Sequence, residues 1–175
     1  MTAPALRFRG YSWGNMYFSQ IQQGIQGWHA QNQFFKKYRL DSPEIKTFLI
    51  WAIKHETLVL LNGGPQSNLM EIERVLNKLT RQLRRSPSDQ REMGVQTIPV
   101  ARFNEEQNAV NGATTAVFAV LPSTAYCLDD AERERLLDLT SELGFRSPLE
   151  AADLGSRVIG LSDRFKLVAM TGKLA

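Results

Sequence analysis

A series of uncharged hydrogen-bonding side chains, spaced along one predicted helix, is where this sequence could do chemistry. Gln22, Gln26, His29 and Gln33 recur at steps of three and four residues, which sets them on one side of a helix. Helix faces open to solvent usually carry Glu and Lys, so this polar, uncharged stripe is unusual. An imidazole can exchange a proton near neutral pH, and an amide can both donate and accept hydrogen bonds. We therefore expect the functional site on this face of the helix.

The helix that carries these side chains has a clear start. Ser19 and Gln22 form the S-x-x-Q pattern of a capping box, and the helical spacing continues over residues 19–38. Gly24 and Gly27 each weaken a helix by roughly 1 kcal/mol relative to Ala. Their presence indicates close approach of another part of the chain or of a ligand.

A second stripe on the same helix is apolar. Ile21, Ile25 and Trp28 recur at i, i+4 and i+7, which is the spacing of a face that packs against a core. We therefore expect these three side chains to be buried.

The composition limits the classes of protein to which this chain can belong. The 175 residues, 43% of them hydrophobic, are enough for one ordinary globular domain, and no apolar run is long enough to span a membrane. The single cysteine, Cys127, allows no disulfide framework and has no histidine nearby in the sequence, so we expect a structural thiol. Two histidines are too few for a typical zinc site unless carboxylates complete it, so no metal is expected and no cofactor is implied. Without an apolar signal segment, a cytoplasmic protein is expected.

The formal net charge of +3 is compatible with a polyanionic partner but does not indicate one by itself. Lys36, Lys37 and Arg39 cluster after the polar stripe. A second series of basic residues lies within residues 74–85. Each cluster fits either a solvated helix end or a surface that contacts phosphates.

Strand-like and helical segments alternate along the chain. Strands are predicted at 6–13, 57–61 (a buried central strand), 96–103 and 114–121, and helices at 19–38, 43–54, 67–85, 129–143 and from 147. Residues 86–94 read as a polar loop, and the ambiguous tail after residue 155 as an extension with a strand at 165–170. This order predicts an α/β fold of three layers: a small mixed sheet of about four strands, with helices on both faces. Residues 1–125 would form this domain, and 126–175 a helical C-terminal extension packed on it.

The helix sequence SQIQQGIQGWHA resembles the first helix of the second, archaeal and eukaryotic class of peptidyl-tRNA hydrolases, which reads G-K-x-x-A-Q-x-x-H-A. With His29 and Ala30 aligned, the family glutamine is Gln26, and Gln22 stands at the family lysine. The resemblance covers residues 6–122. It implies an α/β domain that cleaves the ester between a peptide and the 3′ end of tRNA, and it makes a homodimer conceivable.

A second, weaker motif follows in the expected order. Phe103, Asn104 and Glu105 stand at the family's D-A-G, and a threonine pair precedes the apolar strand AVFAVLP. Divergent bacterial and phage relatives are more similar to this chain. They carry S-x-x-Q-x-x-x-Q-x-x-H-A and an F-x-E loop ahead of T-A, which Phe103, Glu105, Thr115 and Ala116 match.

The resemblance suggests residue roles. His29 or Glu105 would orient or deprotonate water, and Gln22 and Gln26 would bind the carbonyl or ribose. Thr115 completes the candidate catalytic set. The candidate residues for holding tRNA phosphates are Lys36, Lys37 and Arg39.

Three classes of function remain open. The first is an esterase acting on peptidyl- or aminoacyl-tRNA. The second is a binding or regulatory protein that keeps a pocket for a tRNA end or a nucleotide without turnover, because the family lysine and aspartate are replaced. The third is an assembly role, with the glutamine stripe inside an interface. Single residues also have plainer roles: Gln22 in the cap, Gln26 and His29 as braces of the helix, Glu105 as a solvated loop residue and Thr115 as an ordinary strand threonine.

Overall fold

A mixed β-sheet forms the centre of the computed structural model, which describes residues 6–174. Residues 1–5 and 175, which the predicted domain bounds include, lie outside the described residues. The four main strands are β1 (Phe8–Gly14), β2 (Leu58–Asn62), β3 (Val100–Asn104) and β4 (Thr114–Pro122), and the two-residue β5 (Lys173–Leu174) lies beside β2. Their order is β3-β4-β1-β2-β5, with β1 parallel to β2 and antiparallel to β4. Every residue of β4 is buried, as its unbroken apolar sequence favours for a strand covered on both faces.

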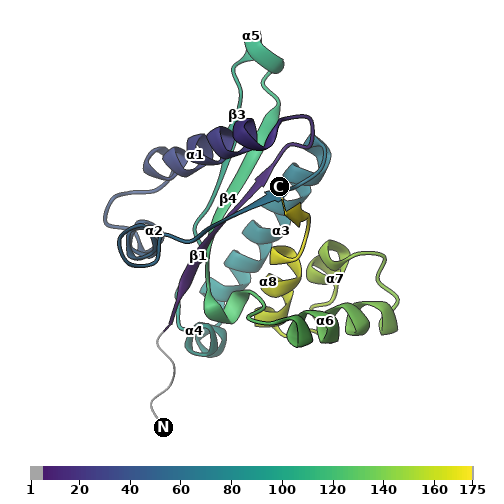
Figure 1. The fold of residues 1–175 in the computed structure, drawn as a ribbon. Helices are drawn as coiled ribbons and strands as arrows, with labels where there is room; N and C mark the ends of the chain where they lie inside the picture. The colour runs from purple at the N-terminus through teal and green to yellow at the C-terminus, as the bar shows by residue number, and fades with distance from the viewer. Residues whose placement is uncertain (1–5, 175) are drawn as a thin grey trace.

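Helices cover both faces of the sheet, which confirms the predicted three-layer α/β fold (Figure 1). One face carries α1 (Gln20–Lys37) and α2 (Pro43–Lys54), and the other carries α3 (Gln66–Arg85) and α8 (Leu161–Ala169). The remaining helical segments are α4 (Pro87–Met93), α5 (Gln107–Val110), α6 (Asp130–Glu142), α7 (Pro148–Leu154) and a 3₁₀ turn (Ser123–Ala125). No helix within residues 6–174 is both long and apolar enough to cross a membrane.

The C-terminal helices are tied to α3 by a partly buried charge contact. Asp153, at the end of α7, accepts hydrogen bonds of 2.6 Å from Arg74 and from Lys78 of α3. Burial raises the pKa of Asp153, but these two cations more than offset it, so the pKa of Asp153 lies below its ordinary value. Two members of the second basic series therefore hold helices together.

Two local predictions were wrong, one in the loop and one in the tail. Residues 86–94 contain α4, because Ser86 caps it by accepting from the Asp89 backbone N–H, Pro87 occupies the first turn, and Met93 is fully buried. Residues 165–170 belong to α8 and its end instead of a strand. Short apolar segments do not distinguish a buried helix from a buried strand by their periodicity.

Two predicted strands also differ in detail. The strand expected from residue 96 begins at Val100, directly after Pro99, which has no backbone N–H to pair in a sheet. β2 is not the fully buried central strand that its apolar sequence predicted. Leu58 is 38% exposed, because β2 has only the two-residue β5 on its outer side.

The apolar stripe of α1 does not face the core, which contradicts the prediction from its spacing. Ile21 is 78% exposed, Ile25 48% and Trp28 61%. The buried residues of α1 are Gln23, Gln26, Gly27, Ala30 and Phe34. The helix is therefore rotated so that its polar and small residues lie against the sheet.

Gly27 explains why this orientation fits the sheet. A Cβ atom at residue 27 would lie 2.5 Å from the Ser12 Oγ of β1, which is closer than such atoms approach. At Gly24 the nearest atom to such a Cβ would be a methyl carbon of Leu60 at 3.8 Å, an ordinary contact. The close approach suggested by the two glycines is therefore found at Gly27 and not at Gly24.

These two glycines give a matched pair of substitutions. We expect Gly27→Ala to lower the free energy of unfolding by about 1–3 kcal/mol, because α1 must move away from Ser12. Gly24→Ala should instead raise it by about 0.5–1 kcal/mol through helix propensity. Urea unfolding followed by circular dichroism measures both values. Equal effects of the two substitutions would contradict this account of the helix orientation.

Candidate functional site

The side of α1 that faces β3 carries the polar stripe found in the sequence. Gln26 is 8% exposed and points to the sheet, and His29, Gln33 and Lys36 follow along the same side of the helix at its rim. The side chain of Gln22 lies at the start of α1, in the helix cap. Its side-chain oxygen accepts from the Ser19 backbone N–H at 2.9 Å, while the Ser19 hydroxyl accepts from the Gln22 N–H, so the predicted capping box is confirmed.

An irregularity in β4 aims Thr115 at α1. Phe103 of β3 pairs with Ala116, whereas the next residue, Asn104, pairs with Thr114, so Thr115 has no partner on β3. Such a bulge redirects a side chain and is often found beside functional sites. The Thr115 carbonyl oxygen instead accepts from the Asn15 backbone N–H at 3.0 Å, on the other side of β4.

Gln26 connects three segments that are far apart in the sequence. Its side-chain oxygen accepts a hydrogen bond from the Thr115 hydroxyl at 3.0 Å. Its Nε2 donates to a carboxylate oxygen of Glu105 at 2.6 Å. Three of the five candidate catalytic residues therefore form one chain of hydrogen bonds, with Gln26 in the middle.

His29 lies beside this chain and packs on an aromatic ring. Its ring meets the ring of Phe103 edge-on, with centroids 4.8 Å apart. Its Nδ1 is buried without a hydrogen-bond partner among the residues that the structure describes. Burying a ring nitrogen without a hydrogen-bond partner costs free energy. A ligand or a water molecule that hydrogen-bonds to Nδ1 would remove this cost.

A hollow of about 570 Å³, which we call the site hollow, opens between α1 and the end of β3. It is lined by polar and charged side chains around Phe103: His29, Gln33, Lys36, Arg102, Asn104, Glu105 and Glu106. A second hollow of about 300 Å³ shares Gln33, Lys36 and Arg102 with it and extends toward Lys37 and Glu73. The two hollows form one continuous polar surface along the outer edge of β3.

The three predicted phosphate-binding cations do not gather at the site hollow. Lys36 lines it, but Lys37 donates from Nζ to the Val100 backbone oxygen at 2.8 Å. Burial lowers the pKa of Lys37 below its ordinary value, which a nearby Glu73 partly opposes. Arg39 is exposed and pairs with Asp41 at 3.2 Å, two residues away.

Arg102 and Asn104 of the site hollow were not predicted from the sequence as site residues. Arg102 lies on β3 and forms an ion pair with Glu73 of α3 at 3.0 Å. Asn104 accepts from the Thr114 hydroxyl at 2.9 Å through Oδ1, so its amide N–H groups remain available as donors. Both positions follow from the strand register, which the sequence pattern does not give.

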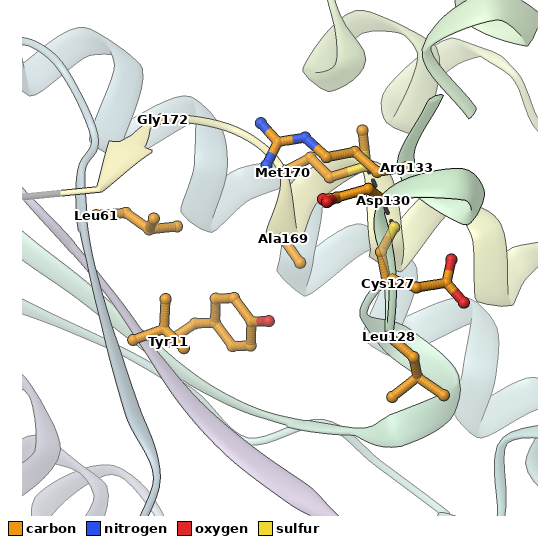
Figure 2. Close-up of a pocket in the computed structure, with 11 residues that line it drawn as sticks. Tyr11, Leu61, Cys127, Leu128, Asp130, Arg133, Ala169, Met170 and Gly172 are labelled. Atoms are coloured by element: carbon orange, nitrogen blue, oxygen red, sulfur yellow. Dashed lines mark hydrogen bonds between the residues drawn. The ribbon is translucent and has the colours of Figure 1, made fainter. Parts of the chain in front are cut away.

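A different hollow, of about 420 Å³, lies on the opposite face of the sheet between β2 and the ends of α6 and α8 (Figure 2). Its walls include Tyr11 and Cys127, and burial raises the pKa of Tyr11 to about 12 and that of Cys127 to about 11. The Cys127 thiol lies 3.4 Å from the sulfur of Met170. A thiol that stays protonated at neutral pH is a poor nucleophile, which agrees with a structural cysteine.

Within residues 6–174 there is no group of three or more His, Cys, Asp or Glu side chains arranged to hold a metal ion. The chain matches no known family model, no curated protein and no solved structure.

The hydrogen bond between Thr115 and Gln26 can be tested by a double-mutant cycle. Thr115→Val leaves a buried amide oxygen without a donor, and Gln26→Met leaves a buried hydroxyl without an acceptor, so each should lower the free energy of unfolding by about 1–3 kcal/mol. The double variant should cost clearly less than the sum of both, because neither partner is then left alone. Urea unfolding measures the cycle, with Thr57→Val on the surface as the control. Additive effects would show that the two side chains are not coupled.

Proposed function

We propose that the site hollow is the active site of an ester hydrolase that acts on peptidyl- or aminoacyl-tRNA. The proposal is carried by the 2.6 Å hydrogen bond between Gln26 and Glu105. This bond joins the two segments that resemble peptidyl-tRNA hydrolases, the helix at 19–30 and the loop at 103–105. It also gives the carboxylate a defined position beside His29, on the wall of the same hollow.

The reaction needs a base that removes a proton from water. One oxygen of Glu105 is held by Gln26, and the other oxygen or the His29 imidazole can take that proton. The water oxygen then attacks the ester carbonyl carbon, and the bond between this carbon and the ribose oxygen breaks. The ribose oxygen leaves with a proton returned by the same group, so the base is regenerated.

The other side chains of the site hollow suit the rest of such a substrate. The amide N–H groups of Asn104, which donate to no side chain or backbone group among the described residues, can donate to the oxygen on which negative charge develops. Lys36 and Arg102 supply positive charge for the phosphates near the 3′ end of tRNA. Gln26, with Thr115 behind it, acts as a positioning residue for Glu105.

We expect the purified protein to release labelled peptide from peptidyl-tRNA. Of the two variants Glu105→Gln and His29→Ala, the one that removes the group that takes the proton should lower the rate by about 10²–10⁴-fold. The other removes a group that orients the water and should lower the rate less. Glu142→Gln makes the same change of charge on the exposed part of α6 and should leave the rate unchanged. Absence of release by folded wild-type protein would contradict the hydrolase proposal.

A second candidate function is binding of a tRNA end or nucleotide without turnover. It is favoured because Gln22 and Gln26, which were expected to hold the ester, already use their side chains in hydrogen bonds within the protein. Gln26 is occupied by Thr115 and Glu105, and the side-chain oxygen of Gln22 by Ser19. The lysine that the family carries at residue 22 has no cationic replacement at that position.

Binding can be tested separately from turnover by its dependence on salt. The affinity for tRNA should fall as salt rises, and Lys36→Ala and Arg102→Ala should each reduce the slope of log K against log salt by about 1. Arg157→Ala, on the opposite layer of the fold, is the control. Salt-dependent binding without peptide release would support the binding function. Unchanged slopes would remove both cations from the phosphate-binding surface.

A further inference from the structure

The hollow of about 420 Å³ that β1 and β2 form with α6 and α8, which we call the Tyr11 hollow, contains a buried hydrogen-bond donor (Figure 2). Tyr11 is 6% exposed, and its hydroxyl points into the hollow. Arg9 lies beside this hydroxyl but can only donate, so the Tyr11 O–H has no acceptor among the described residues. A buried donor without an acceptor costs free energy, which a ligand in the hollow would recover.

The mouth of the Tyr11 hollow carries one positive and one negative side chain that have no ion-pair partner. Arg133 and Asp130 lie one turn apart on α6, and both exposed side chains line the hollow. The next arginine of α6, Arg135, is paired with Asp163 at 3.0 Å, but within residues 6–174 neither Arg133 nor Asp130 forms an ion pair. A third charged residue of the lining, Asp129, already caps α6 through its side chain.

The rest of the lining is largely apolar. Leu61 of β2 and Ala169 of α8 are buried, and Val59, Leu128 and Met170 add further apolar surface. Sites for small molecules usually have volumes of about 300–1,000 Å³, so this hollow lies near the lower end of that range. It therefore suits a small ligand that has an apolar part.

The two opposite charges at the mouth restrict the charge of such a ligand. An apolar anion would be repelled by Asp130, and an apolar amine by Arg133. A neutral apolar molecule would leave the Tyr11 hydroxyl without an acceptor. A small molecule that carries a carboxylate and an ammonium group next to an apolar group meets all three side chains with the opposite charge or an acceptor.

We infer that the Tyr11 hollow binds a free α-amino acid with an apolar side chain. Its carboxylate accepts from the Tyr11 hydroxyl and the Arg133 guanidinium, and its ammonium group donates to Asp130. Its side chain packs against Leu61 and Ala169. Because β1 and β2 supply one wall of the hollow and α6 and α8 the other, the bound amino acid holds the C-terminal helices on the sheet.

The inference does not depend on the chemistry of the site hollow, which lies on the opposite face of the sheet. An amino acid bound in the Tyr11 hollow contacts none of the residues that line the site hollow. Binding can therefore be measured whatever the outcome of the hydrolysis assay.

NMR titration of the ¹⁵N-labelled full chain with L-leucine or L-phenylalanine tests the inference. The amide signals of Val59 and Gly172 in the Tyr11 hollow should shift, and that of Glu105 in the site hollow should not. Absence of shifts with both amino acids at about 10 mM, which saturates a site of millimolar affinity, would overturn the inference.

Three variants test the assigned contacts in the same titration. Tyr11→Phe, Arg133→Gln and Asp130→Asn should each weaken L-leucine binding about 3–10-fold, because each removes one polar contact and keeps the size of the side chain. Arg135→Gln removes the same charge from α6 outside the hollow and should leave the affinity unchanged. Equal effects of Arg133→Gln and Arg135→Gln would contradict the assigned carboxylate contact.

Two analogues of leucine test whether both charges are recognised. 4-Methylpentanoate lacks the ammonium group, and 3-methylbutylamine lacks the carboxylate, so each should bind about 3–10-fold more weakly than L-leucine. Arg133→Gln should not weaken the amine further, and Asp130→Asn should not weaken the carboxylate further. An analogue that binds as tightly as L-leucine would show that the Tyr11 hollow recognises one charge only and would overturn the inference.

Discussion

The short distance between α1 and the sheet is the constraint on which the rest of the site depends. Only a glycine at residue 27 lets the helix lie this close to Ser12. At this height the amide of Gln26 reaches both Thr115 on β4 and Glu105 after β3. A helix held farther from the sheet would lose both hydrogen bonds and leave a buried amide without partners, at a cost of about 1–3 kcal/mol.

The same constraint gives α1 an orientation that an isolated amphipathic helix would not choose. Two glutamines are buried while large apolar side chains face solvent. The burial is only partly compensated: Gln23 donates to the Phe18 oxygen at 3.0 Å, but its own side-chain oxygen has no partner among the described residues. The orientation of α1 is therefore unfavourable on both of its faces, and the close contact between Gly27 and Ser12 is what it makes possible.

Sequence periodicity was sufficient for the layers and for most elements, because α3 and β4 each carry one dominant pattern. It failed at α1, where an apolar and a polar stripe have the same spacing, so the pattern could not decide which one meets the sheet. That choice depends on side-chain size at Gly27, a tertiary property. The glutamine–histidine motif and the F-x-E loop did indicate the candidate site. The roles of Thr115 and Arg102 could not be derived, since a bulge and a strand register position them.

The exposed apolar side of α1 and the side that lines the site hollow are neighbours. The exposed Trp28 and His29 in the site hollow are consecutive, and their ring centroids lie 6.1 Å apart. Phe103 already contacts the His29 ring from the sheet side. Because proton transfer needs a base held within hydrogen-bonding reach of its water, the edge-on contact with Phe103 is the restraint on the His29 ring that such a role would use.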